Sequence, residues 1–241
     1  MNEDKKVLIT GASGGLGRAC AVEAAKAGYY VICHYNGSKA KAEETLAQVQ
    51  AVGGKGELIQ FNISDRADCK AKLDELTAKL TANGEILWGI ISNAGITRDN
   101  TFVGLEDSDW DSVIHTNLDS FYNVLKPLVM TMASRKNKRG GRIITVASVS
   151  GIIGNRGQTN YSASKGAFSS VIPRTRAISR SCSFAPFVSP QRVHFAPIQL
   201  WPISLQIKPI SFAPFLSTGQ DQLFVLVNCP LWYHNLSCFA N

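Results

Sequence analysis

The chain has 241 residues, of which 45% are hydrophobic and 18% are charged. This composition fits one globular domain with a sizeable core, and it excludes disordered, collagen-like and small disulfide-stabilised chains. The formal net charge is +7, and residues 171–241 contribute five Lys or Arg but only one acidic residue, Asp221. The basic balance would permit nucleic-acid binding, but no recognition motif accompanies it, so we expect a solvated basic surface and no nucleic-acid partner.

The N-terminal segment MNEDKKVLIT mixes charges with a strand-like run, so we expect no signal peptide. No apolar run reaches about 18 residues, so we expect no membrane partner. The six cysteines form no Cys-x-x-Cys pair, which indicates free thiols and neither a metal site nor a disulfide framework. Together these features predict a cytoplasmic protein.

The first 170 residues alternate short apolar runs with helical patterns. We expect strands at residues 6–10, 29–35, 57–63, 86–92 and 142–148. We expect helices at 18–27, 39–52, 66–81, 107 to about 135 (where two helices fit) and 160 to about 172. Continuous apolar strands separated by helices indicate a parallel sheet covered on both faces, and right-handed crossovers make it a doubly wound α/β fold.

Residues 169–241 do not continue this pattern. Eight of the nine prolines but only one of the twenty glycines lie within residues 171–241. Pro173 would break the last helix, and only residues 222–227 favour a strand. We therefore divide the chain into residues 1–168 and an atypical segment, 169–241. We hypothesise that the second part is read out of frame, and resequencing of the gene would test this.

A glycine-rich loop follows the first strand and opens the first helix. It reads Thr10-Gly-Ala-Ser-Gly-Gly-Leu-Gly17, with glycines at 11, 15 and 17 that let the backbone turn tightly and approach a ligand. The following helix N-terminus offers N–H groups and a positive dipole end to a pyrophosphate. The alternative is a plain tight turn, but the strand–turn–helix context favours dinucleotide binding.

The end of the second strand bears on which dinucleotide binds. An NAD site usually places a carboxylate here for the ribose 2′-hydroxyl, and the sequence His34-Tyr35-Asn36 has none. A 2′-phosphate would meet no repulsion and could contact Ser38 and Lys39. This favours NADPH over NADH, although Lys39 could equally be the solvated start of a helix.

Tyr161 and Lys165 are four residues apart in a predicted helix, so they share one face. A nearby ammonium favours the phenolate, so we expect Lys165 to lower the pKa of Tyr161. Such a tyrosine can protonate a carbonyl oxygen, and Ser148, at the end of a strand, could hydrogen-bond that oxygen. A Tyr-x-x-x-Lys pair alone also occurs on ordinary surface helices, whereas the ordered set with the glycine loop is far more specific.

Residues 5–168 resemble the short-chain dehydrogenase/reductase family, and within it the 3-oxoacyl-acyl-carrier-protein reductases. The segments that carry the resemblance are LITGASGGLG (8–17), SNAGITRDN (92–100), WDSVIHTNLDSFYNV (110–124) and GRIITVASVSGIIGNRGQTNYSASKGAF (141–168). The resemblance implies a Rossmann-like fold and a catalytic tetrad of Asn117, Ser148, Tyr161 and Lys165. Tyr161 would be the acid, Ser148 would polarise the substrate carbonyl, Lys165 would hold the nicotinamide ribose, and Asn117 would hold a water of the proton relay.

The implied reaction is NADPH-dependent reduction of 3-oxoacyl thioesters on acyl-carrier protein, in fatty-acid or related synthesis. The residues expected to bind the cofactor are Gly11, Ser13, Gly14, Gly15, Leu16, Gly17, Asn36, Ser38, Asn62, Ile63, Asn93, Ala94, Gly95, Tyr161 and Lys165. Family members form homo-oligomers. Residues 135–139, with four basic side chains, could dock the acidic carrier or could be a solvated loop.

Three features depart from the family pattern. Gly14 stands where many NADP-dependent members have Arg, and Asn62 stands where an Asp usually meets the adenine. The third feature is the segment after residue 168, which lacks the family's Pro-Gly turn, its substrate lid and its last two strands. We therefore expect an unpaired edge on the sheet, doubtful oligomer formation and, as the alternative function, a catalytically defective reductase without a complete pocket.

Overall fold

The computed structural model describes residues 5–133, 141–168 and 226–230. The strands are β1 (Lys5–Ile9), β2 (Tyr30–Tyr35), β3 (Gly56–Gln60), β4 (Ile86–Ser92), β5 (Arg142–Val146) and β6 (Leu226–Pro230). The helices are α1 (Gly15–Lys26), α2 (Lys39–Ala51), α3 (Arg66–Ala82), α4 (Asp107–Ile114), α5 (Ser120–Met132), α6 (Ser150–Ile153) and α7 (Thr159–Gly166). A short 3-10 turn (Phe102–Gly104) precedes α4, and a π-helical turn (His115–Asp119) joins α4 to α5.

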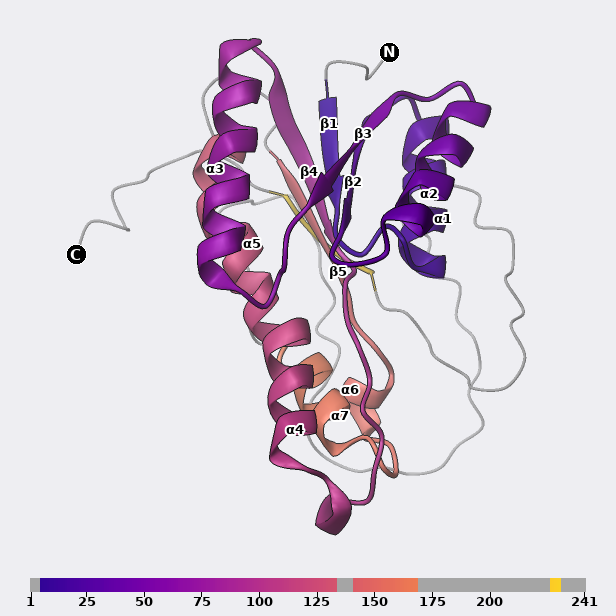
Figure 1. Ribbon diagram of the computed structural model, residues 1–241, viewed down its shortest axis with the longest axis vertical. Coiled ribbons are helices and arrows are strands. Elements are labelled where there is room, and N and C mark those ends of the chain that lie inside the picture. The colour runs from indigo at the N-terminus through magenta and orange to yellow at the C-terminus, as the bar shows by residue number, and fades with distance from the viewer. Residues whose placement is uncertain (1–4, 134–140, 169–225, 231–241) are drawn as a thin grey trace, which may run out of the picture. The chain divides into compact units, whose positions relative to one another are not determined.

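The strands form one sheet in the order β3-β2-β1-β4-β5-β6, in which β1 to β5 are parallel. The chain order reverses between β1 and β4, where Ile9 pairs with Cys33 on one side and with Ile91 on the other. This confirms the doubly wound α/β fold (Figure 1). Ligands of such folds bind outside the carboxyl ends of the strands at this reversal.

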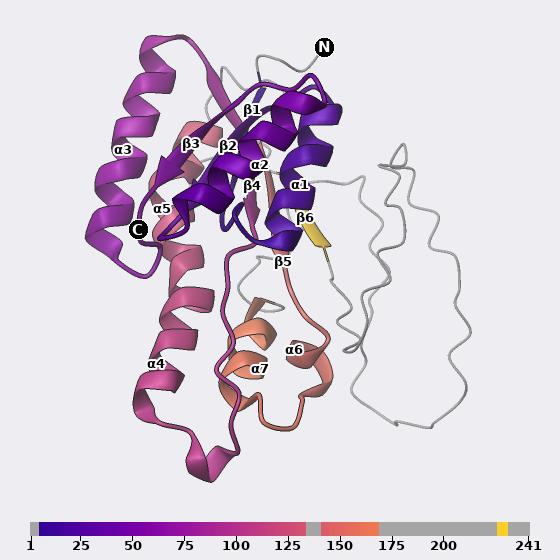
Figure 2. The same cartoon turned by 45° about the vertical axis from the view of Figure 1, so that its right-hand side comes forward.

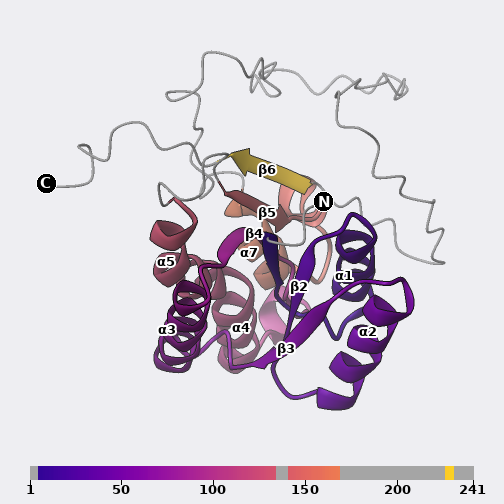
Figure 3. The ribbon, with the colours of Figure 1, turned by 90° about the horizontal axis from the view of Figure 1, so that it is seen from above.

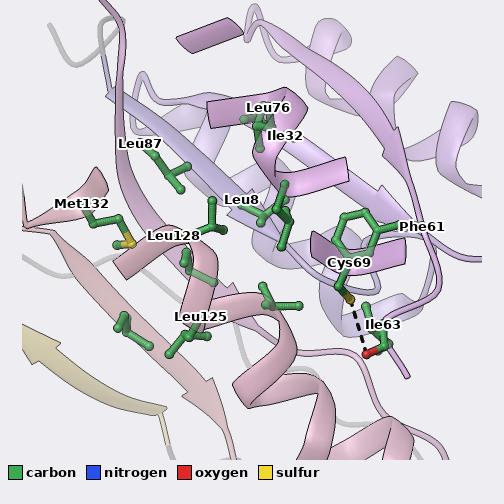
Figure 4. Close-up of a cluster of buried hydrophobic side chains, with 14 of the residues drawn as sticks. Leu8, Ile32, Phe61, Ile63, Cys69, Leu76, Leu87, Leu125, Leu128 and Met132 are labelled. Atoms are coloured by element: carbon green, nitrogen blue, oxygen red, sulfur yellow. Dashed lines mark hydrogen bonds between the residues drawn. The ribbon is translucent and has the colours of Figure 1, made fainter. Parts of the chain in front are cut away.

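Strand alternation sends apolar side chains to both faces of the sheet. Val7 and Ile9 pack with α1 and α2, whereas Leu8, on the same strand, packs with α3 and α5. Figure 3 shows these two helix pairs on opposite sides of the sheet. The cluster under α3 and α5 contains fully buried Leu87 and Leu128 (Figure 4). Both faces are covered, which explains why the strands have continuous apolar sequences.

Several local features differ from the expected elements. α1 begins at Gly15 rather than at residue 18, and β5 ends at Val146, so Ser148 lies two residues beyond the strand. β3 ends at Gln60 rather than at residue 63, yet Phe61 and Ile63 remain buried in the core, and the Cys69 thiol donates to the Ile63 carbonyl at 3.5 Å (Figure 4). The apolar character of Phe61 and Ile63 therefore reflects their burial in the core and not pairing within a strand. The region expected to hold one or two helices is interrupted by a π-helical turn. The short helix α6 was not anticipated.

The expectation of an unpaired edge on the sheet is wrong at β5. β6 pairs with β5 in antiparallel fashion, from Arg142 opposite Pro230 to Val146 opposite Leu226. The expected strand at 222–227 overlaps β6, but residues 222–225 lie outside the described residues. Apart from β6, all of residues 169–241 lie outside the described residues. The division of the chain at residue 168 and the out-of-frame hypothesis therefore stay predictions.

Among residues 5–133, 141–168 and 226–230, none of the helices combines the length and the apolar character that a membrane span requires.

Candidate active site

A cavity of about 690 Å³ opens at the carboxyl ends of the parallel strands. At this edge of the sheet, the chain leads from β5 toward α6 and α7 (Figure 2). All fifteen residues expected to bind the cofactor line it: Gly11, Ser13, Gly14, Gly15, Leu16, Gly17, Asn36, Ser38, Asn62, Ile63, Asn93, Ala94, Gly95, Tyr161 and Lys165. The fold therefore brings together residues as far apart in the sequence as Gly11 and Lys165.

The first turn of the glycine loop is held by the strand next to it. Gly11 has φ +66°, which side-chain-bearing residues rarely adopt, and a Cβ there would lie 2.9 Å from Ala94 Cα. The Thr10 hydroxyl accepts hydrogen bonds from the backbone N–H groups of Asn93 (3.0 Å) and Ala94 (3.1 Å). The Asn93 amide donates back to the Thr10 carbonyl at 3.0 Å. These hydrogen bonds thus join the segments that follow β1 and β4 at the cavity.

The N-terminus of α1 has the properties of a phosphate site. Its N-cap is Gly14, which has no side chain that could cap the helix, and no acidic residue lies in the first turn. A Cβ on Gly15 would meet nothing within 4 Å, so this backbone faces open space in the cavity wall. Backbone N–H groups and the helix dipole favour an anion there. The residues present fit the pyrophosphate of a dinucleotide.

Asn36 and Ser38 line the end of the cavity where the adenosine ribose is expected, but Lys39 does not. Lys39 is exposed and pairs with Glu43 at 3.6 Å, which agrees with the alternative of a solvated helix start. The Asn62 side-chain oxygen accepts hydrogen bonds from the N–H and the hydroxyl of Ser64, at 3.1 and 2.7 Å.

The residues expected to act in catalysis converge at the end of β5. Tyr161 and Lys165 lie one turn apart on α7, both are buried, and both line the cavity. Ser148 is fully buried, and its hydroxyl lies near enough to Tyr161 to favour the phenolate and lower the pKa of Tyr161. Its Oγ also accepts the Ser150 N–H at 3.3 Å. The Lys165 ammonium donates to the Val146 carbonyl at 3.0 Å, which fixes α7 against the strand.

The expected lowering of the Tyr161 pKa by Lys165 is wrong for this arrangement. Burial raises the pKa of Tyr161 above its usual value and outweighs the opposing effect of the Ser148 hydrogen bond, while the Asp99 charge raises it further. Lys165 Nζ lies 5.8 Å from the Tyr161 ring centroid. Burial lowers the pKa of Lys165 itself to about 8. Tyr161 is therefore protonated at neutral pH, as a proton donor must be.

Asn117 lies in the π-helical turn, a feature common at functional sites. Its side chain accepts from the Ile96 N–H at 2.8 Å and donates to the Ile96 carbonyl and the Ser164 hydroxyl, both at 3.0 Å. A Cβ on Gly95 would lie 3.1 Å from Asn117 Oδ1 and 3.4 Å from Lys165 Nζ. Asn117 thus joins the loop after β4 to α7. Its expected role in holding a relay water stays a prediction.

Two residues of the site were not anticipated. Buried Gln158 donates to Asp99 at 2.9 Å and accepts from the Ser150 hydroxyl at 3.1 Å, which joins the starts of α6 and α7. His34 lines the cavity and is also buried. Its signal in the sequence is an ionisable residue inside an otherwise apolar strand, whereas Gln158 has no comparable signal.

The basic residues Arg135, Lys136, Lys138 and Arg139 lie outside the described residues. In the part of the chain that is described, no three His, Cys, Asp or Glu side chains lie together in a way that could hold a metal ion.

Replacing Lys165 with methionine is expected to change how stability depends on pH. Because the folded pKa, about 8, is below the usual 10.5, the unfolded chain binds more protons between these values. The wild type therefore gains stability relative to Lys165→Met as the pH rises from 8 to 10.5, by roughly 3 kcal/mol at most. Urea unfolding of both proteins at pH 7 and pH 10 measures this gain, and parallel pH profiles would contradict the burial of the ammonium.

Comparison with known proteins identifies the family. Residues 5–177 match the family model for short chain dehydrogenases. The chain is 46% identical over 159 residues to the 3-oxoacyl-acyl-carrier-protein reductase FabG of Aggregatibacter actinomycetemcomitans, over 66% of this chain and 63% of that protein. It is 38% identical over 180 residues to the reductase of the same name from Staphylococcus aureus strain Mu50, over 75% of this chain and 69% of that protein.

Nodulation protein G of Azospirillum brasilense is a further relative, 40% identical over 174 residues, which are 72% of this chain and 67% of that protein. The chain thus spans somewhat under two thirds of the length of the Aggregatibacter relative. The family match covers more than half of the chain and includes the glycine loop, Ser148, Tyr161 and Lys165. The chain belongs to the short-chain dehydrogenase family.

Proposed function

We propose that this chain is an oxidoreductase that reduces the 3-keto group of 3-oxoacyl thioesters with NADPH. The observation that carries the proposal is the convergence of Tyr161, Ser148 and Lys165 beside the cavity that begins at the glycine loop. The family supports an oxidoreductase, and the names of the two reductase relatives support this class of substrate.

Each residue has a role that follows from its surroundings. A bound dihydronicotinamide supplies the hydride that the keto carbon takes up. The Tyr161 hydroxyl, kept protonated by burial, donates its proton to the keto oxygen. Ser148 orients that hydroxyl and shares the oxygen as a hydrogen-bond partner. Lys165 and Asn117 fix α7 against β5 and the loop after β4, and so hold Tyr161 at the cavity wall.

The choice of NADPH over NADH rests on the end of β2. Asn36 and Ser38 line the cavity where a carboxylate would bind the 2′-hydroxyl of NADH. A 2′-phosphate meets no negative side chain from these two residues. Because Gly14 stands where many NADP-dependent members have an arginine, one contact to the 2′-phosphate is missing. We therefore expect only a moderate preference for NADPH over NADH, about tenfold in kcat/KM.

The acyl group is expected to arrive on acyl-carrier protein, as the names of the relatives suggest. Homo-oligomer formation and carrier docking by residues 135–139 stay predictions of the sequence, since no described contact bears on them.

The direct test follows NADPH oxidation at 340 nm by purified full-length protein with an acetoacetyl thioester, with NADH in parallel. We expect turnover with both nucleotides and the higher kcat/KM with NADPH. Soluble protein that binds NADPH but gives no turnover would contradict the proposal and favour the catalytically defective reductase. An equal or higher kcat/KM with NADH would overturn the choice of cofactor alone.

A further inference from the structure

His34 connects two parts of the lining of the nucleotide cavity: the glycine turn and the segment after β3. It is the next-to-last residue of β2, its relative exposure is 1%, and its ring packs against the Phe61 ring with centroids 4.1 Å apart. Nδ1 lies 3.2 Å from the Gly11 backbone nitrogen, and Nε2 lies 2.9 Å from the Phe61 carbonyl oxygen. One side chain thus touches both the glycine turn and the end of β3.

The chemistry of these two partners fixes the form of the imidazole ring. A carbonyl oxygen can only accept, so Nε2 must carry a hydrogen and donate it to Phe61. A backbone N–H can only donate, so Nδ1 must be the acceptor for Gly11. Both bonds therefore require the neutral ring protonated at Nε2. Burial supports this form, because it lowers the pKa of His34 to about 4 against the opposing effects of the Phe61 hydrogen bond and the Asp68 charge.

The two bonded groups lie at places that shape the cavity. Gly11 is the positive-φ residue that turns the glycine loop toward α1, and the next N–H, of Ala12, donates to the His34 carbonyl at 2.9 Å. Phe61 directly precedes Asn62 and Ile63, which also line the cavity. The His34 ring therefore holds the Gly11 turn at a fixed distance from the segment that carries Asn62 and Ile63.

We propose that His34 is a positioning residue for the dinucleotide, holding the Gly11 turn at a fixed distance from the end of β3 through its neutral ring. The inference rests on the proposed function only in that a dinucleotide fills this cavity. Since the His34 ring bonds to Gly11 and Phe61 and to none of Tyr161, Ser148 and Lys165, we expect it to act on nucleotide affinity and not on the proton-donating step.

Matched variants separate the contributions of the two bonds. His34→Leu removes both, His34→Asn can keep an acceptor near the Gly11 N–H, and His34→Gln can keep a donor near the Phe61 carbonyl. An unpaired buried donor costs enough to weaken NADPH binding by about tenfold or more in His34→Leu. We expect His34→Asn and His34→Gln each to restore part of the affinity, with kcat at saturating NADPH within about twofold of wild type.

Cys33→Ala is the control for general destabilisation, because Cys33 is the buried neighbour of His34 on β2 and packs on the α1–α2 side of the sheet. NADPH dissociation constants are measured by nucleotide fluorescence, and Cys33→Ala is expected to leave the constant within about twofold of wild type. A second measurement, the ¹⁵N shifts of the His34 ring at pH 7, is expected to show the neutral Nε2–H tautomer.

Wild-type affinity in His34→Leu would overturn the proposal. So would equal weakening in Cys33→Ala, or a charged or Nδ1–H ring at pH 7. If wild-type protein binds NADPH without turnover, the proposed reaction fails while the affinities still test His34. If wild-type protein binds no NADPH, the proposed function and the positioning role both fail, whereas a wrong tautomer overturns the role of His34 alone.

Discussion

Replacing Tyr161 with phenylalanine is expected to lower the rate of NADPH-dependent reduction of an acetoacetyl thioester by about 100- to 10,000-fold. The change removes the hydroxyl that would protonate the keto oxygen and leaves the aromatic ring, which lines the cavity. The loss therefore falls on kcat, because the proton donor acts only while the keto oxygen gains charge. Steady-state kinetics of both proteins at saturating NADPH measures it.

Tyr122→Phe is the matched control for this experiment. Tyr122 lies on α5 with half of its surface exposed, and it is not among the residues that line the cavity, so the substitution removes the same kind of hydroxyl outside the site. We expect its kcat to stay within about twofold of wild type. A Tyr161→Phe protein that folds, binds NADPH and retains more than about a tenth of the wild-type kcat would show that Tyr161 is not the proton donor.

Replacing Gly17 with alanine is expected to destabilise the protein by about 3 kcal/mol and to lower Tm by about 6–12 °C. A Cβ at this position would lie far inside van der Waals contact with the Gly11 carbonyl oxygen, and 2.7 Å from Asn93 Nδ2. The Gly11 oxygen is backbone, held in the turn that Ala94 and Thr10 fix, so it cannot easily move away. The clash forces α1 away from the β1 turn.

Gly15→Ala tests whether the loss of stability in Gly17→Ala comes from the close packing of Gly17 or from any replacement of a loop glycine by alanine. Gly15 lies in the same turn of α1, but a Cβ there meets nothing within 4 Å. Because alanine favours the helix over glycine, we expect the stability of Gly15→Ala to be unchanged or raised by up to about 1 kcal/mol. Equal Tm values for the two variants, measured by circular dichroism, would contradict the close approach of Gly17 to Gly11.

The sheet and the nucleotide cavity could be predicted from the sequence because both follow from local patterns. The apolar run at 86–92 coincides with β4, and the second helix was expected to begin at Lys39, where α2 begins. The cavity followed from the topology, since the carboxyl ends of parallel strands meet at one edge. The glycine loop, the end of β2 and the segment after β4 lie together for that reason.

Other features depend on packing that no local pattern reports. Phe61 and Ile63 look like strand residues but are buried beyond the end of β3, because apolar character records burial and not pairing. The pKa of Tyr161 was expected to fall because the spacing to Lys165 was known, whereas the extent of burial was not. The role of His34 required knowing that Gly11 and Phe61, 50 residues apart, contact one ring.

The central claim is that this chain moves a hydride from a nicotinamide to the keto carbon of a 3-oxoacyl thioester. The most direct measurement uses NADPH deuterated at C4, prepared separately in each of the two stereochemical forms, with an acetoacetyl thioester and the full-length protein. We predict a 3-hydroxybutyryl thioester with deuterium at C3 from one form and none from the other, as mass spectrometry would show. Unchanged ketone, or an alcohol without deuterium from either form, would contradict the account.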